Sequence, residues 1–428
     1  MSDQQLAEIL RFKAILLCEG LEVSEEVIKT TQEAGIQFDM GRQGGAGPAG
    51  GRYFKFSNGS IVNTPLFRAP YDHSTYRIRS ISATHEVQLE KKHTHQIPRN
   101  NEQEIPSTNN SFAPSHPIQQ GSSNDHPFQQ NLSEDHPQIH LIPTPEFYRQ
   151  ENEEGIPFKK IALMHGDTTL ATTINQRCRY WQGNQQCQFC GLELSLQSDA
   201  TIDVKSGKQL VDTIGIARTE NPQFAGHLTL TIGTTPTKDK GMQEYLDVIS
   251  TIRQTYPTVP IHIQIEPMQD LTWYQRLKDA GATTIGIHLE ILDDDARSKI
   301  CPGKAHISKS TYYQHWDQAL AVFGKNQVST FILTGFYQNL TLFKQQLREV
   351  LAHGVLPVIT PARHLNGTSL APTFTPVIDF LEILEFAAHV CHELGIDPTA
   401  NRAGCIRCGG CSSLIDAYRL QSGKVNLS

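Results

Sequence analysis

The sequence lacks long apolar runs, an excess of basic residues and a recognisable secretory leader. No segment approaches the roughly 18 consecutive apolar residues of a membrane-spanning helix. Lysine and arginine number 37 against 44 aspartate and glutamate residues, and the net charge of −7 argues against a broad nucleic-acid-binding surface. The N-terminus has no basic start followed by an apolar block and a small-residue cleavage site. We therefore expect a cytoplasmic protein that binds neither membranes nor nucleic acids.

Cysteine is the most informative residue type that is present. Clustered thiols in a reducing compartment are more often metal ligands than disulfides, and an odd total argues against a complete disulfide framework. Six of the nine cysteines form two tight clusters, and the nine are Cys18, Cys178, Cys187, Cys190, Cys301, Cys391, Cys405, Cys408 and Cys411. We expect metal sites at the two clusters.

Residues 1–83 are expected to form a small α+β unit. Helical periodicity covers residues 3–17 and 24–34, and Asn58-Gly59 between two apolar runs predicts a β-hairpin. The glycine-rich run at residues 44–51 could cradle a phosphate or a cofactor, or could be a loop that needs positive φ angles.

Residues 84–140 differ in kind from the rest of the chain. They are rich in histidine, glutamine, asparagine and proline, and a ten-residue repeat spaces His116, His126 and His136 evenly. Histidine-rich tracts can bind metal, but a segment with so few aliphatic residues cannot bury a core. We expect a disordered insertion.

The segment 141–395 alternates apolar strands with helices. The strands are expected at 170–176, 227–233, 260–267, 283–291, 328–335 and 355–361, and the helices that follow them at 206–220, 239–256, 270–280, 308–323, 340–353 and 375–394. Several of these helices end at a glycine, which is the usual αL stop signal. Continuous apolar strands suit a parallel sheet covered on both faces, either doubly wound or curled into a six-unit, incomplete barrel.

In both arrangements, reactive groups are expected at the carboxyl ends of the parallel strands. The polar residues at those ends are Thr234, Thr235, Glu266, Glu290 and Arg363.

The first cysteine cluster directly follows the first strand of this series. Cys178, Cys187 and Cys190 lie in one loop with no histidine or fourth cysteine beside them. Three thiolates can hold three irons of a [4Fe–4S] cluster and leave the fourth iron open, since full ligation would use four cysteines. Zinc is the rival, although such zinc sites generally add a histidine or another cysteine.

The second cysteine cluster lies in the C-terminal segment 396–428. Cys405, Cys408 and Cys411 have C-x2-C-x2-C spacing, which is the start of a bacterial ferredoxin run without its fourth cysteine. Neighbouring glycines allow a tight loop around a cluster. We expect an auxiliary iron–sulfur cluster near a barrel rim, with zinc or unliganded thiols as alternatives; Cys391 is a possible fourth ligand, although burial in its helix is the better interpretation.

The sequence resembles the radical SAM superfamily in two respects. A three-cysteine loop follows the first strand of a six-fold βα series, and Phe189 stands directly before the third cysteine. Eight residues separate Cys178 from Cys187, whereas most members have three. Residues 1–80 and 140–420 further resemble a radical SAM family encoded beside a nitrilase in bacterial gene clusters. The matching signatures are Gly44–Pro48, IALMHGD (161–167), CQFCG (187–191), LTIGTT (230–235), IQIEP (263–267), GIHLE (286–290), CPGKA (301–305), QVSTFILTG (327–335) and AGCIRCGGC (403–411).

The resemblance implies a partial (β/α)6 radical SAM barrel that carries a [4Fe–4S] cluster and S-adenosylmethionine. Cys178, Cys187 and Cys190 would be the iron ligands, and the cofactor-binding positions would be Phe189, Gly191, Gly233, Thr234, Thr235, Glu266, Glu290 and Gly335. The alternatives are ordinary structural roles: the threonines could cap the helix at 239–256, the glutamates could be solvated or ion-paired, and Gly335 could serve a turn. His288 could line the cavity or be a satisfied core histidine.

The resemblance also implies reductive cleavage of S-adenosylmethionine and radical chemistry on a small molecule. The nitrilase association points to nitrile- or amide-related metabolism, and electrons would come from a reductase, flavodoxin or ferredoxin. Substrate-site candidates are Arg297, Lys299, Lys304, Arg363 and His364, and no catalytic residue can be assigned. A non-catalytic electron-transfer or cluster-carrier protein with the same six cysteines is the alternative function.

Overall fold

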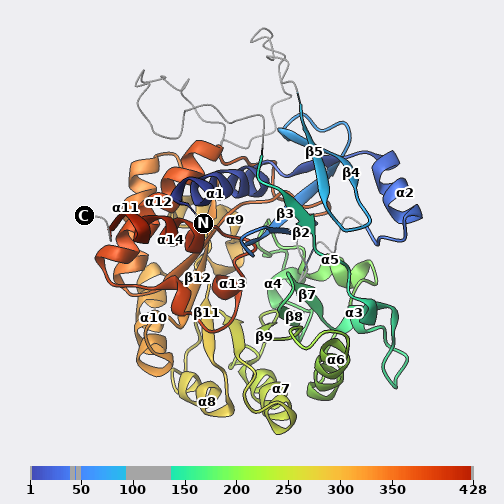
Figure 1. The fold of residues 1–428 in the computed structure, drawn as a ribbon. Coiled ribbons are helices and arrows are strands. Elements are labelled where there is room, and N and C mark those ends of the chain that lie inside the picture. Colours follow the sequence, from blue (N-terminus) through green and yellow to red (C-terminus); the bar gives the residue numbers. More distant parts are fainter. Residues whose placement is uncertain (1, 39–43, 45–49, 93–135, 426–428) are drawn as a thin grey trace.

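A computed structural model describes residues 2–38, 44, 50–92 and 136–425 of the chain. Two sheets organise it, a six-stranded N-terminal sheet and a seven-stranded sheet that curls into a partial barrel (Figure 1). Gly45–Pro48 of the glycine-rich run and residues 93–135 of the histidine-rich tract lie outside the described residues.

In the N-terminal sheet, β1 lies between β3 and β4 and is parallel to both, whereas the other neighbouring strands are antiparallel. The strand order is β5-β4-β1-β3-β2-β6. The predicted hairpin is present, since β2 and β3 are antiparallel and Gly59 has a φ of +84°. The elements are α1 (Asp3–Cys18), β1 (Leu21–Val23), α2 (Glu25–Glu33), β2 (Gly51–Phe56), β3 (Ile61–Arg68), β4 (Tyr76–Ile81), β5 (Val87–Lys91) and β6 (Ile139–Leu141).

Strand β5 and the first two residues of β6 lie inside the range 84–140, which we expected to lack regular structure. Strand β5 pairs with β4, and β6 pairs with β2. Val87, Ile139 and Leu141 are buried in the main core. The ends of this range therefore belong to the N-terminal sheet, because even its short apolar stretches find cross-strand partners.

The second sheet confirms the prediction of a partial (β/α)6 barrel. Its order is β13-β12-β11-β10-β9-β8-β7, and every neighbouring pair from β8 to β13 is parallel. The antiparallel edge strand β7 was not predicted. The strands are β7 (Leu163–His165), β8 (Thr169–Thr173), β9 (His227–Thr231), β10 (Ile261–Ile265), β11 (Thr284–Ile287), β12 (Val328–Thr334) and β13 (Leu356–Pro361).

Six helices cover the outer face of the barrel (Figure 1). They lie close to their predicted positions, as α6 (Gly207–Glu220), α7 (Met242–Thr255), α8 (Trp273–Ala280), α10 (Lys309–Phe323), α11 (Leu340–Ala352) and α12 (Val377–Glu393). The glycines that follow four of them have positive φ angles, which confirms the predicted stop signals at Gly281, Gly324, Gly354 and Gly395.

Short elements connect these units and form the C-terminus. They are η1 (Glu146–Arg149), α3 (Phe158–Ile161), α4 (Arg179–Gln182), α5 (Leu192–Gln197), α9 (Asp294–Ile300), η2 (Pro302–Lys304), η3 (Pro398–Ala400), α13 (Cys405–Cys408) and α14 (Leu414–Val425). Helix α14 packs against α12 and α1, which brings the C-terminal segment beside the N-terminal unit. Within the described ranges, none of the helices combines the length and apolar character needed to cross a membrane.

Candidate metal centres

The first cysteine loop leaves the carboxyl end of β8, as the sequence predicts. Backbone hydrogen bonds fix both of its sides: Arg179 N–H donates to the Thr234 carbonyl after β9 at 2.8 Å, and Gln188 N–H donates to the Ile300 carbonyl at 2.8 Å. The Cys178 N–H donates to the Glu193 carboxylate of α5 at 3.1 Å. The loop therefore spans the mouth of the barrel between β9 and α9.

The three thiols of this loop are close enough to influence one another. Burial, and then the charge of Cys187, raises the pKa of the Cys190 thiol to about 12. Burial is the main cause that raises the pKa of Cys178, which also responds to Cys187. Thiolates that are buried together repel one another, so they need a cation between them, and three such sulfurs fit the ligand set of an iron–sulfur cluster.

Two glycines let backbone segments approach this loop. A Cβ on Gly233 would clash with the Arg177 carbonyl, immediately before Cys178. A Cβ on Gly44 would clash with the Gly191 carbonyl, immediately after Cys190. The positions that the resemblance assigns to cofactor binding at Gly233 and Gly191 therefore lie in the wall of the loop, where Gly233 leaves no room for a side chain and Gly191 is in close contact with Gly44. Gly44 is the one described residue of the glycine-rich run's first half, and it touches this site.

The CPGK turn at 301–304 closes the other side of the loop. A hydrogen bond with buried Cys301, and burial, raise the pKa of Cys187 well above its ordinary value. Arg297 was a candidate for binding a carboxylate ligand. Its Nη1 instead donates to the Ile307 carbonyl at 2.8 Å and its Nη2 pairs with Asp294 at 3.2 Å, so it anchors the turn.

Glu266 is held by partners on three elements. Its Oε1 lies 2.6 Å from Lys240 Nζ and accepts the Tyr180 hydroxyl at 3.1 Å, and its Oε2 accepts the Thr234 hydroxyl at 3.0 Å. Thr234 therefore does not cap α7, whose N-cap residue is Gly241 without a side-chain hydrogen bond. Thr235 bonds to Thr237 instead at 2.6 Å. The Thr234 hydroxyl proton is committed to Glu266, which leaves its oxygen as an acceptor at the mouth of the barrel.

Glu290 has one engaged and one unengaged oxygen. Oε1 lies 2.5 Å from Lys304 Nζ, whereas the buried Oε2 has no hydrogen-bond partner among the described residues. Burial raises the pKa of the carboxyl, and the Lys304 ammonium opposes that shift. The backbone φ of Glu290 is +63°, a strained value for a residue with a side chain. This constrained, half-satisfied carboxylate next to the cysteine loop has the acceptor capacity that ligand hydroxyls require.

The remaining predicted cofactor positions line the same mouth. Phe189 packs on the small apolar cluster that contains Cys187, Ile291 and Cys301. Gly335 has a φ of +101°, and the Thr373 side chain lies where its Cβ would be. The loop at 373–375 therefore covers the end of β12.

The second cysteine group lies inside the barrel, away from the first. The segment that leads into it contacts the amino ends of the strands: the Thr284 hydroxyl of β11 donates to the Ala403 carbonyl at 3.2 Å, and Gly404 N–H donates to His227 Nδ1 of β9 at 3.3 Å. We expected the chain to return toward a barrel rim. It returns to the rim opposite the first cysteine loop, because α12 runs antiparallel to the strand before it.

Two sulfurs of the second group receive side-chain donors from different strands. Gln264 Nε2 of β10 donates to Cys405 Sγ at 3.4 Å, and Asn63 Nδ2 of β3 donates to Cys411 Sγ at 3.6 Å. The Cys408 thiol instead donates to the His165 carbonyl at 4.0 Å, and burial raises its pKa to about 11. Neutral donors directed at sulfur are the usual outer partners of metal-bound thiolates.

Lys13 of α1 holds the loop between the second and third of these cysteines. Its buried Nζ donates to the Gly409 carbonyl at 2.9 Å and pairs with Asp416 of α14 at 2.6 Å. The pairing itself could not be predicted, because Lys13 and Asp416 stand at opposite ends of the chain. The sequence does show a lysine on the apolar face of α1, which indicates that Lys13 has a buried partner.

Tyr53 and Arg363 also face the second cysteine group. The buried Tyr53 hydroxyl has no partner among the described residues; burial, and then the three cysteines led by Cys411, raise its pKa well above the ordinary value. Arg363 donates to the Asn63 carbonyl. The expectation that Arg363 faces the same mouth as the first loop is wrong, since Arg363 turns to the second group. Exposed His364 bonds to the Leu370 carbonyl at 2.7 Å, and the Leu370 N–H donates to the Gln188 carbonyl of the first loop at 3.0 Å, so His364 lies beside that loop.

Among the described residues, no three histidine, cysteine, aspartate or glutamate side chains converge closely enough to hold a single metal ion. A cluster of several irons spaces its cysteine ligands more widely than one ion does. Cys391 is fully buried in the core face of α12, in line with its interpretation as a structural thiol.

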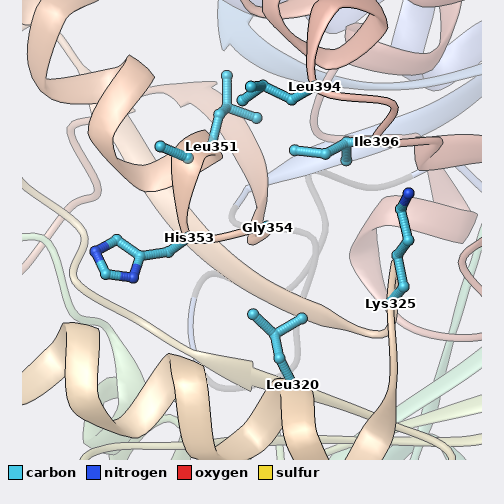
Figure 2. Close-up of a pocket in the computed structure, with 8 residues that line it drawn as sticks. Leu320, Lys325, Leu351, His353, Gly354, Leu394 and Ile396 are labelled. Atoms are coloured by element: carbon cyan, nitrogen blue, oxygen red, sulfur yellow. The ribbon is translucent and has the colours of Figure 1, made fainter.

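The pocket in Figure 2 lies at neither cysteine group. It has a volume of about 360 Å³ and opens between the ends of α10, α11 and α12. Its lining residues are Leu320, Lys325, Leu351, Ala352, His353, Gly354, Leu394 and Ile396. This lining is mostly aliphatic, with Lys325 and His353 as its polar members, and it includes neither a cysteine nor a carboxylate.

No family model and no curated protein matches the chain. Solved structures share part of the fold. HydG, a maturase of the FeFe-hydrogenase, has 16% identity and a TM-score of 0.41 over 63% of this chain and 64% of its own. HemN of Escherichia coli, a coproporphyrinogen III oxidase described as a radical SAM enzyme, has 13% identity and a TM-score of 0.37 over 53% and 52%. AnSMEcpe with bound AdoMet and a peptide has 10% identity and a TM-score of 0.35 over 57% and 62%. The chain thus spans less than two thirds of each.

Proposed function

We propose that the chain is a radical SAM enzyme whose reactive [4Fe–4S] cluster is held by Cys178, Cys187 and Cys190. The observation that carries this proposal is the set of three free cysteines in one loop at the carboxyl end of the first parallel strand, without a fourth cysteine in the loop. When bound, such a cluster supplies the electron that cleaves S-adenosylmethionine into methionine and a 5′-deoxyadenosyl radical.

The residues of the chain would bind and orient the sulfonium cofactor. The Thr234 oxygen, whose proton is given to Glu266, is free to accept from the methionyl ammonium. The unengaged Oε2 of Glu290 is suited to accept from the ribose hydroxyls. Lys240 and Lys304 neutralise these two carboxylates, so the mouth binds a zwitterionic cofactor without a large net charge.

The second cysteine group would hold an auxiliary iron–sulfur cluster. The support is the pair of side-chain donors, Gln264 to Cys405 and Asn63 to Cys411, together with the ferredoxin-like spacing. The substrate would be a small molecule of nitrile- or amide-related metabolism, in line with the family that the sequence resembles, and the electrons would come from a flavodoxin, ferredoxin or reductase.

The test is product formation by the anaerobically reconstituted protein. With S-adenosylmethionine and dithionite, the native chain should release 5′-deoxyadenosine, measured by liquid chromatography. Cys187→Ala should release none, whereas Cys301→Ala should retain cleavage, because Cys301 only bonds to a ligand. Iron-loaded native protein that releases no 5′-deoxyadenosine would instead support an electron-transfer or carrier protein.

A further inference from the structure

The inner face of the barrel is partly exposed between the two cysteine groups. On neighbouring strands, the inward side chains of Thr231, Gln264 and His288 are partly exposed, although the residues beside them in each strand, which face the helices, are buried. A barrel of this size usually fills its interior with packed side chains. The inner face is therefore not completely filled by its own side chains.

Hydrogen bonds fix the tautomer of His288 on this face. The Phe331 backbone N–H donates to His288 Nδ1 at 3.1 Å, so Nδ1 carries no proton. The proton of the neutral ring is therefore on Nε2. That buried N–H has no partner among the described residues.

The neighbouring His262 has the opposite tautomer. Its Nδ1 lies 2.8 Å from the Thr284 hydroxyl oxygen, and the single hydroxyl proton of Thr284 goes to the Ala403 carbonyl. His262 Nδ1 must then donate, which leaves Nε2 as a bare acceptor. This Nε2 is also buried and has no partner among the described residues.

The two unpartnered nitrogens converge over Gly286. The point where a Cβ of Gly286 would lie is 2.5 Å from His288 Cε1, 3.0 Å from His288 Nε2 and 3.1 Å from His262 Nε2, so both nitrogens are directed to the side of the strand that only a glycine leaves open. Burial lowers the pKa of His262 to about 3 and that of His288 well below its ordinary value, so both rings are neutral at working pH. One donor and one acceptor, both uncharged, therefore face the same spot.

We propose that His262 and His288 bind an uncharged molecule that presents a hydrogen-bond acceptor and an N–H donor on neighbouring atoms, as a primary carboxamide or a urea does. The acceptor would take the His288 Nε2 proton, and the donor would reach His262 Nε2. An ammonium group is disfavoured, because two neutral rings offer it no countercharge in a buried place. The role of this molecule as the substrate rests on the proposed function; its binding does not.

Binding can be measured on the iron-loaded protein by ligand-observed saturation-transfer difference NMR. The probe is acetamide, followed through its methyl signal, and the comparison ligand is N,N-dimethylacetamide, which keeps the carbonyl but has no N–H. We expect a saturable signal for acetamide and at least a fivefold weaker one for the dimethyl compound. A ligand comparison of this kind needs no variant and is independent of any folding defect.

Three variants locate the site. Gly286→Ala should abolish the acetamide signal, because its methyl group would lie 2.5 Å from His288 Cε1 and must displace that ring from its place beside His262. His288→Phe should abolish it by removing the donor, and His353→Ala, on the outer surface, should leave it unchanged. No saturable acetamide signal, equal signals for the two amides, or full signal in both interior variants would overturn the proposal. A protein that binds acetamide but never cleaves S-adenosylmethionine would refute the proposed function and leave the histidine pair standing.

Discussion

The two cysteine groups present the same number of sulfurs in opposite surroundings. The first faces charged pairs, Glu266 with Lys240 and Glu290 with Lys304, at the carboxyl ends of the strands. The second is enclosed by neutral donors from two strands and by neutral histidines. Charged, half-satisfied groups suit a site that binds and releases a charged cofactor, whereas neutral donors directed at sulfur suit a site that holds one metal cluster permanently, and at the second group the Lys13–Asp416 pair and Arg363 add charge only around it.

The largest expected effect is the loss of the metal cluster at one cysteine group while the cluster at the other group remains. The triple variant Cys405→Ala/Cys408→Ala/Cys411→Ala should lose about four irons per chain, as one [4Fe–4S] unit requires. Its remaining cluster should still change its EPR spectrum when S-adenosylmethionine is added, since that cofactor is expected at the first group only. Full iron content with loss of zinc would show instead that the second group is a structural zinc site.

A second prediction concerns the anchor of the second group. Lys13→Met leaves Asp416 buried without its partner, and we expect the free energy of unfolding to fall by about 3 kcal/mol. Urea unfolding measures this, and iron content should fall at the second group first, because Lys13 also holds Gly409. The control is Lys29→Met, which removes an exposed pair with Glu33 and should change stability by less than about 0.5 kcal/mol. Equal effects of the two variants would contradict the buried-anchor interpretation.

The structure explains which of these features the sequence could predict. The six strands and their helices were predictable, because their apolar patterns are local and glycines such as Gly281 end the helices. The first cysteine loop follows its strand directly, so its place at the barrel mouth also follows from local order. The surroundings of the second group could not be predicted from the sequence. Asn63 is far from Cys411 along the chain, and Gln264 lies within an otherwise ordinary strand, so no local pattern shows that either side chain contacts a sulfur.

A third prediction separates the two carboxylates of the first group. Glu290→Gln should raise the KM for S-adenosylmethionine about tenfold, the equivalent of about one charge-assisted hydrogen bond. Glu266→Gln should change the KM less, because both of its oxygens already have protein partners. Both variants remove a charge that faces a lysine, so stability is no discriminator between them. A larger KM effect for Glu266→Gln would assign ribose binding to β10 instead.

A fourth prediction concerns acid. Burial lowers the pKa of His262 and His227 to about 3 and that of His315 to about 4, so the folded protein binds fewer protons than the unfolded chain below pH 6.5. Stability is therefore full above that pH and falls as pH decreases, by about 1–2 kcal/mol per histidine at pH 5. Urea unfolding between pH 7 and 5 measures the slope. His315→Phe should reduce it, and an unchanged slope would show that His315 is charged in the folded state.

The smallest expected effect comes from the tract that we expected to be a disordered insertion. Because 84–140 contains β5 and most of β6, removal of that whole range should damage the N-terminal unit, which supplies Asn63 and Lys13 to the second cysteine group. Removal of 93–135 alone, with a short glycine–serine linker from Lys92 to His136, spares both strands. Iron content, melting temperature and 5′-deoxyadenosine release should then stay within experimental error of the native values.

The two deletions also probe the comparison between the cysteine groups. Loss of 84–140 should lower the iron held by the second group before that held by the first, since the donors of the first group all lie on the barrel. EPR of the two reduced clusters, with and without S-adenosylmethionine, distinguishes them. If removal of 93–135 alone causes the second group to lose its iron, that stretch contributes to the metal site directly. The donors on the strands would then not be sufficient to explain how the second group holds metal.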